Sequence, residues 1–175
     1  MRYELTNETK AIEVDGTTHT LHRIKALKGF ICQGRKVEIG DLGGFVEAKR
    51  NLSQVENSTA WVFGDAFVYD NAKVNNNAKV CDNALVYGFA TVCDNAKVCG
   101  SAKVYGDAKV YGDAKVCGDA KVCDNAKVCG SADISCSEDI YYDDANGITY
   151  MKGRNGILIS NATFDDFIKT VKANN

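Results

Sequence analysis

A six-residue repeat constrains the fold of this chain more than any other feature of its sequence. Thirteen consecutive units run from Ala60 to Ser137 without an insertion or a deletion, as in Ala102–Asp107 (AKVYGD) and Ala114–Asp119 (AKVCGD). A valine recurs at every sixth position from Val62 to Val128, and Ile134 closes the series. A solvated low-complexity segment has no reason to keep a β-branched residue in phase for so long, so we expect a folded array of repeats.

Each unit has the composition of one short strand and one corner. In the segment Ala-Lys-Val-Tyr/Cys, strand alternation sends alanine and valine to one side and lysine and tyrosine or cysteine to the other. The Gly-Asp, Asp-Asn or Gly-Ser pair that follows tolerates positive φ angles and marks a bend. Because one unit cannot bury its valine alone, successive turns must stack into parallel sheets.

This register of aliphatic, turn and small residues resembles the hexapeptide-repeat family of left-handed parallel β-helices, which place three units in each coil. The resemblance covers Ala60–Ser137 and implies an all-β fold with a left-handed parallel β-helix of a little over four coils. The run GDLGGFVEAKRNLSQ, which leads into AWVFGDAFVYDNAKV, is similar to the opening of phage and prophage repeat proteins. It is also similar to uncharacterised acyltransferase-like bacterial repeat proteins.

The segments outside the array are predicted to cap it. Residues 1–59 form a β-rich N-terminal cap, because strand-like segments flank a hairpin signal at Asp15-Gly16. Residues 60–137 form the β-helix, and residues 138–175 form an α+β C-terminal cap. In that second cap, two strand-like segments around Arg154-Asn155-Gly156 precede Thr163–Val171, whose apolar stripe and first-turn acids favour a short helix. We expect a strand-strand-helix arrangement there.

Large side chains that point outward gather in the first coils. With three units per coil, residues 18 apart stack about 4.8 Å from one another, and one such column reads Tyr69, Tyr87, Tyr105, Cys123. Exposed apolar patches of this kind are usually covered, and the N-terminal segment is the obvious cover. Aromatic residues are also enriched in binding hot spots. The predicted binding residues are Trp61, Phe67, Tyr69, Tyr87, Phe89 and Tyr105.

The sequence offers little for catalysis or for a metal. Hexapeptide-repeat acyltransferases use a histidine base, and the related carbonic anhydrases need three histidines. Here His19 and His22 are the only histidines, and their spacing on a predicted strand points them to opposite faces. Cysteine and tyrosine exchange at one repeat position, which favours packing over zinc or copper(I) binding. We expect no catalytic residue, no metal and no cofactor, with one histidine as a lone base as the alternative.

Composition argues against several other classes of protein. The 21 basic and 23 acidic residues give a net charge of −2, which excludes a strongly basic nucleic-acid or membrane-surface binder. No apolar run approaches the roughly 20 residues of a membrane span, and the polar N-terminus lacks a signal core. We expect a cytoplasmic protein, in the host cytoplasm if it is phage-encoded, with reduced cysteines.

These patterns favour a non-catalytic interaction protein of phage or prophage origin. Its expected role is to inhibit a host process, such as antiviral defence, by binding a protein or sequestering a small ligand. We also expect self-association as a trimer or dimer through the flat faces of the prism. Two alternatives stay open, an acyl-coenzyme A-dependent acyltransferase and a structural component of a virion or assembly.

Overall fold

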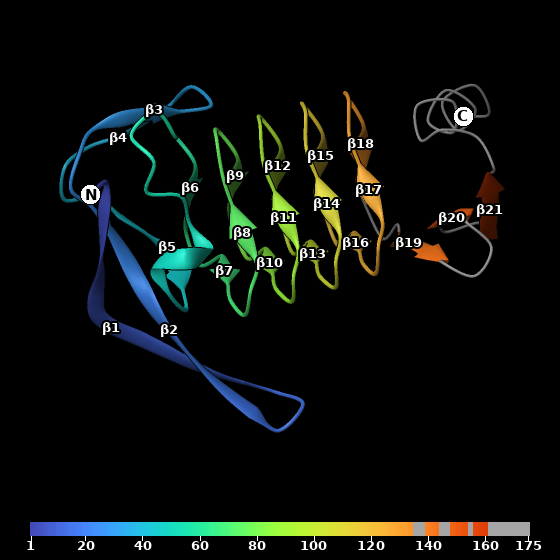
Figure 1. Ribbon diagram of the computed structural model, residues 1–175, viewed down its shortest axis with the longest axis horizontal. Coiled ribbons are helices and arrows are strands. Elements are labelled where there is room, and N and C mark those ends of the chain that lie inside the picture. The colour runs from blue at the N-terminus through green and yellow to red at the C-terminus, as the bar shows by residue number, and fades with distance from the viewer. Residues whose placement is uncertain (135–138, 144–147, 154–155, 161–175) are drawn as a thin grey trace.

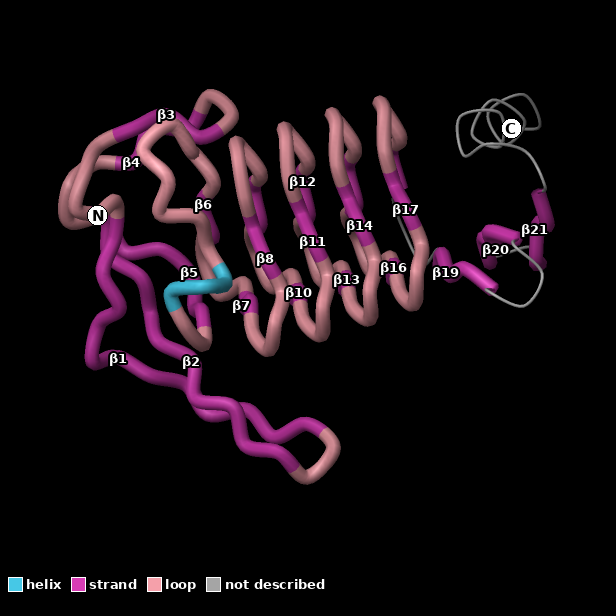
Figure 2. Tube along the Cα trace, in the orientation of Figure 1, coloured by secondary structure: helices cyan, strands magenta, loops and turns pink. Residues whose placement is uncertain are grey.

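The chain folds into an elongated β-solenoid, seen in a computed structural model that describes residues 1–134, 139–143, 148–153 and 156–160 (Figure 1). Within these residues the only helix is a single turn of 3₁₀ helix, η1 (Lys49–Asn51). Figure 2 shows short strands stacked in columns along the solenoid and a long hairpin, β1–β2, that leaves its N-terminal end. The predicted all-β solenoid of parallel strands is therefore confirmed.

The thirteen repeat units form thirteen two-residue strands, β6 to β18. Partner residues in neighbouring coils are 18 apart, as for Leu85 and Lys103, so three units complete one coil. The inward alanines and valines are buried throughout. The strands are β6 (Trp61–Val62), β7 (Phe67–Val68), β8 (Lys73–Val74), β9 (Lys79–Val80), β10 (Leu85–Val86), β11 (Thr91–Val92), β12 (Lys97–Val98), β13 (Lys103–Val104), β14 (Lys109–Val110), β15 (Lys115–Val116), β16 (Lys121–Val122), β17 (Lys127–Val128) and β18 (Asp133–Ile134).

The corners between the strands confirm the turn residues predicted from the repeat. Each corner from Gly64 to Gly130 that has a positive φ angle is occupied by glycine, aspartate or asparagine, for example Asp94 at φ 58° and Gly100 at φ 68°. Aspartate and asparagine adopt this left-handed region more readily than other residues with a Cβ atom. The first residue of each turn pair is thus selected by backbone conformation.

One face of the solenoid belongs to a ten-stranded sheet that continues into both ends of the chain, in the order β1-β2-β5-β7-β10-β13-β16-β19-β20-β21. Within this sheet, the strands from β5 to β19 pair parallel to one another. The pairs β1–β2, β2–β5, β19–β20 and β20–β21 at its two ends are antiparallel. The other two faces carry the sheets β8-β11-β14-β17 and β6-β9-β12-β15-β18. The outer strands are β1 (Tyr3–Val14), β2 (Thr17–Ala26), β5 (Leu42–Val46), β19 (Asp139–Asp143), β20 (Ile148–Gly153) and β21 (Gly156–Ser160).

The parallel ladder begins before the first repeat unit. Val46 of β5 pairs with Val68, and Leu52 forms a bridge with Val74, in both cases across 22 residues. Residues 45–60 therefore form an irregular first coil that is longer than the others and contains η1. Glycine is required where this coil begins, because a Cβ atom on Gly43 or Gly44 would lie 2.6 Å from a backbone oxygen of the next coil.

At the C-terminal end the predicted hairpin is confirmed, since β20 and β21 pair antiparallel on either side of residues 154–155. The predicted helix over Thr163–Val171 lies outside the described residues. In the part of the chain that the structure describes, no helix is long and apolar enough to cross a membrane.

Candidate functional site

The N-terminal segment covers outward aromatic side chains of the first coils, as predicted. Trp61 is only 1% exposed, and its ring meets the edges of Tyr3 and Phe30 with 6.2 and 5.4 Å between centroids. The guanidinium of Arg2 lies 4.4 Å from the centroid of the Phe30 ring. Trp61 therefore packs inside the cap and leaves almost no surface exposed, and its predicted role in binding stays a prediction.

A second, shorter hairpin fastens this cap to the side of the solenoid. It consists of β3 (Phe30–Cys32) and β4 (Arg35–Val37). At its tip, Gln33 donates from Nε2 to the carbonyl oxygens of Asn77, Asn95 and Ala96 at 3.0, 2.9 and 3.1 Å. Beside it Cys32 is fully buried, and burial raises the pKa of its thiol to about 11. The contacts of Gln33 therefore join the cap to two successive coils.

Tyr69, Tyr87 and Tyr105 form a stacked column, the tyrosine ladder, beside the ten-stranded sheet. Neighbouring rings are 5.0 Å apart between centroids and only 3° and 5° from parallel. The spacing follows from the distance between adjacent strands. Tyr69 is 3% exposed, whereas Tyr87 and Tyr105 are half-buried. Burial also raises the pKa of both half-buried hydroxyl groups. The predicted column is confirmed, and its exposure increases along the solenoid.

The β1–β2 hairpin extends from the N-terminal end of the solenoid (Figure 1), and its contacts with Tyr69 cover the N-terminal end of this ladder. Its side chains Ile12 and Val14 pack against a small apolar cluster that includes Tyr69. Lys10 adds an ion pair, with 2.9 Å between its Nζ and Asp65 Oδ1, and this lysine lowers the pKa of Asp65. The whole cluster consists of Leu21, Phe45 and Tyr69, with Ile12, Val14, Phe67 and Tyr87 at its edge. Of the predicted residues, Phe67 and Tyr87 lie at this boundary, and Phe89 is 63% exposed.

Beneath the hairpin, three polar side chains from three elements converge beside Tyr69. His19 lies on β2, Glu47 directly follows β5, and Asp70 occupies the corner after β7 with a φ angle of 56°. His19 Nδ1 lies 3.1 Å from Glu47 Oε1 and 3.5 Å from Asp70 Oδ1. His19 is buried, and the centroid of its imidazole is 5.1 Å from that of the Tyr69 ring. We call these three residues the hairpin cluster.

Sequence reasoning missed two members of this cluster. Asp70 is one of many corner aspartates, and the repeat gives no signal that singles it out. Glu47 belongs to the irregular first coil, which the six-residue pattern does not cover. The two histidines have different partners, because His22 Nδ1 lies 3.2 Å from the carbonyl oxygen of Thr6 whereas His19 contacts Glu47.

The cysteine columns stack as predicted and bring a second group of possible ligands together. The Sγ atoms of Cys81 and Cys99 and a carboxylate oxygen of Asp82 lie within 4.8 Å of one another. Burial, reinforced by the charge of Asp82, raises the pKa of Cys81 to about 12. A metal binds the thiolate form, so this environment disfavours a soft-metal site.

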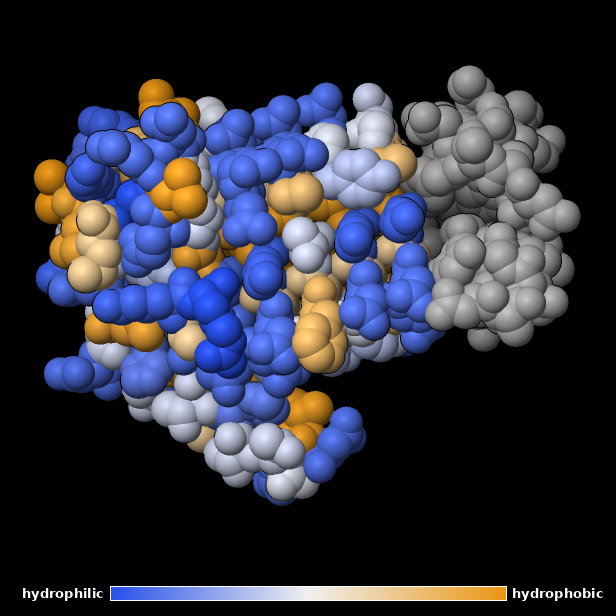
Figure 3. All heavy atoms as spheres, viewed as in Figure 1, coloured by the Kyte–Doolittle hydropathy of each residue, from blue (hydrophilic) through white to orange (hydrophobic). Residues whose placement is uncertain are grey.

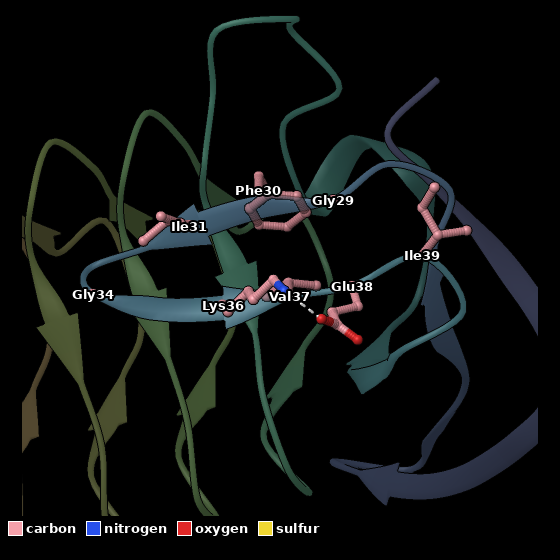
Figure 4. Close-up of a pocket in the computed structure, with 8 residues that line it drawn as sticks. All are labelled: Gly29, Phe30, Ile31, Gly34, Lys36, Val37, Glu38 and Ile39. Carbon is pink, nitrogen blue, oxygen red and sulfur yellow. Dashed lines mark ion pairs between the residues drawn. The ribbon is translucent and has the colours of Figure 1, made fainter.

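Two shallow hollows lie at the N-terminal end. The first, of about 540 Å³, is apolar: Phe30, Ile31, Val37 and Ile39 line it, and Lys36 and Glu38 form an ion pair at its edge (Figure 4). The second, of about 750 Å³, is polar and runs along the corners at Asn75–Asn77 and Cys93–Asn95. On the face seen in Figure 3, apolar residues form separate spots among hydrophilic ones at the N-terminal end, and smaller apolar patches lie between the hydrophilic residues of the solenoid.

Comparison of the sequence with protein-family models and with curated proteins finds no match. The tyrosine ladder, the hairpin cluster and the apolar hollow at the N-terminal end are therefore the features from which a function can be inferred.

Proposed function

We propose that this protein is a non-catalytic binding protein, which recognises its partner with the open part of the tyrosine ladder and the adjoining N-terminal cap. The stacked, half-buried rings of Tyr87 and Tyr105 carry this proposal. Stacking holds them in place before a partner arrives, so little side-chain entropy is lost on binding. Tyrosine offers both an apolar ring and a polar hydroxyl group, and it is enriched in binding hot spots.

The environment of the two histidines supports binding over acyl transfer. His19 is held between two carboxylates under the hairpin, and His22 contacts a backbone carbonyl oxygen. Neither histidine lines either of the two hollows described above. A general base must reach the proton that it abstracts from a bound substrate, so these surroundings favour a non-catalytic role for both side chains.

The biological setting of the proposal rests on the resemblance of the repeat. We take the coil as left-handed, as in the hexapeptide-repeat family, and the protein as encoded by a phage or prophage. Its role is then to inhibit a host process such as antiviral defence, by binding a host protein or sequestering a small ligand in the host cytoplasm.

Self-association belongs to the same proposal. Most of the large exposed apolar side chains among the described residues lie in the N-terminal segment, and apolar residues on a surface are candidates for an interface. We propose a dimer or trimer, which size-exclusion chromatography with light scattering measures directly. The exposed side chains at this end are Met1, Leu27, Ile31, Ile39, Leu42 and Val55.

Capture from host lysate with matched variants tests the binding surface. Tagged wild-type protein is compared with Tyr87→Ser/Tyr105→Ser and with the control Lys109→Ser/Lys127→Ser, which changes exposed residues of another sheet. Mass spectrometry of captured proteins and small molecules should find a species that the tyrosine variant loses and the control keeps. Circular dichroism verifies the folds. The same species on all three proteins would contradict the proposed surface.

A further inference from the structure

We propose that the hairpin cluster, His19, Glu47 and Asp70, binds one divalent transition-metal ion, with zinc as the best fit. The three elements that supply these residues meet only in the folded chain. One ligand atom from each residue lies within 4.8 Å of the others, and His19 Nδ1 lies close to both Glu47 Oε1 and Asp70 Oδ1. The site would fasten the β1–β2 hairpin to the first two coils.

The spacing of the ligand atoms suits a small tetrahedral ion. Zinc binds imidazole nitrogen and carboxylate oxygen at about 2.0–2.2 Å, which places ligands of a tetrahedron about 3.3–3.6 Å apart. The measured separations from His19 Nδ1 are 3.1 Å to Glu47 Oε1 and 3.5 Å to Asp70 Oδ1. Both separations from the imidazole nitrogen are therefore close to those of a zinc site. Three protein ligands leave a fourth position for water, as in open zinc sites.

The oxygen atoms that would not bind the metal are already held by the backbone. The backbone N–H of Asp70 donates to Glu47 Oε2 at 2.7 Å, and that of Gly88 donates to Asp70 Oδ2 at 3.0 Å. Arg50 Nη2 also lies 3.6 Å from Glu47 Oε2. These contacts fix both carboxylates with Oε1 and Oδ1 turned toward His19. Such outer contacts orient the ligands of established metal sites.

The donor set and its surroundings indicate the class of ion. Two carboxylates and a neutral imidazole balance the charge of a divalent cation. Magnesium and calcium prefer oxygen ligands alone, whereas imidazole nitrogen suits zinc and its neighbours in the first transition row. The side chains of His19, Glu47 and Asp70 are 11%, 25% and 31% exposed, which leaves a route by which an ion can enter. Their partial burial also strengthens the electrostatic attraction between the carboxylates and a cation.

Metal titration of the full chain tests this site independently of the proposed function. Chelator-treated protein is titrated with zinc chloride by calorimetry and with cobalt(II) by visible absorption. We expect one equivalent to bind, with the spectrum of four-coordinate cobalt and no thiolate charge-transfer band. His19→Gln and Asp70→Asn should each weaken zinc binding about 100-fold or more, because even outer partners of a metal site contribute about 10- to 100-fold.

Two control variants make the result decisive. His22→Gln should bind zinc like the wild type, since His22 lies outside the cluster. Cys81→Ser/Cys99→Ser should also bind normally, and loss of binding there would overturn the proposal by placing the metal at the cysteines. No saturable binding by the wild type, or undiminished affinity in His19→Gln and Asp70→Asn, would overturn it as well. Thermal melts without metal verify folding, and zinc should raise the melting temperature only where the cluster is intact.

Discussion

At the scale of single residues, the stacking of corners decides which side chains the solenoid tolerates. A Cβ atom on Gly100 would lie 2.9 Å from the backbone nitrogen and oxygen of Gly118 in the next coil. Asp82 occupies the equivalent corner one coil earlier, and there its carboxylate accepts a hydrogen bond from the backbone N–H of Gly100 at 3.0 Å. An aspartate above a glycine therefore adds a contact between coils, which explains why both residues recur in these columns.

Substituting Gly100 by alanine should separate steric overlap from backbone strain. In Gly100→Ala, the alanine would have to adopt a positive φ angle of 68°, and its Cβ atom would also overlap the backbone of the next coil. Gly34→Ala is the matched control, since Gly34 has a φ angle of 79° but open space around it. We expect a loss of about 1–2 kcal/mol for Gly34→Ala and a larger loss for Gly100→Ala, measured by urea unfolding. Equal losses would show that the neighbouring coil yields freely.

The buried thiol of Cys32 predicts a loss of stability at alkaline pH. Its pKa is raised from 9.0 to about 11 in the folded protein, so the unfolded chain releases this proton first. The contribution of this thiol to the free energy of unfolding is therefore constant below pH 9. It falls by about 2–3 kcal/mol in total as pH rises to about 11. Urea unfolding of the wild type and Cys32→Ala across this range measures the difference, which should shrink as pH rises. A constant difference would contradict the assigned environment.

At the scale of elements, the regular parts of the fold were predictable and the irregular parts were not. Every repeat unit carries its own strand and corner residues, so the strands and their inward–outward register follow from local sequence. Trp61 shows the limit of this reasoning, because alternation correctly points it outward but says nothing of the cap that buries it. The hairpin cluster lies beyond that limit for the same reason, since His19 meets Glu47 across 28 residues.

The same limit applies to the β3–β4 hairpin, whose attachment depends on one side chain. Gln33→Ala removes the Nε2 contacts to three carbonyl oxygens of the solenoid. We expect faster hydrogen exchange in Phe30–Val37 and a loss of about 1–3 kcal/mol in unfolding free energy. Lys36→Ala, at an exposed position of the same hairpin, is the control and should change neither. Unchanged exchange in Gln33→Ala would mean that apolar packing alone holds the hairpin.

At the scale of the whole molecule, the solenoid is a modular spacer between two different ends. Its central coils repeat the same inward residues and the same contacts, so each coil interacts mainly with its neighbours. Among the described residues, the hairpin cluster, the covered end of the ladder and most of the exposed apolar side chains lie at the N-terminal end. This arrangement separates the stability of the array from the recognition that we propose.

The loss of stability on deleting part of the array should therefore depend more on whether the repeat stays in phase than on how many residues are removed. Removal of Cys99–Val116 takes out one coil and joins Val98 to Cys117, so the corner and the 18-residue register between β10 and β16 are kept. Removal of Cys99–Asp113 takes out fewer residues but joins Val98 directly to Ala114, which eliminates a corner and shifts all later strands by half a unit. Since array stability is close to a sum of coils and the interfaces between them, the in-phase deletion loses one coil and keeps native interfaces.

The shorter deletion also disrupts the contact between the two remaining halves. We expect one cooperative thermal transition for the in-phase protein, and a lower or divided transition for the out-of-phase protein, both followed by circular dichroism. Greater damage from the in-phase deletion would show that the coils are not interchangeable.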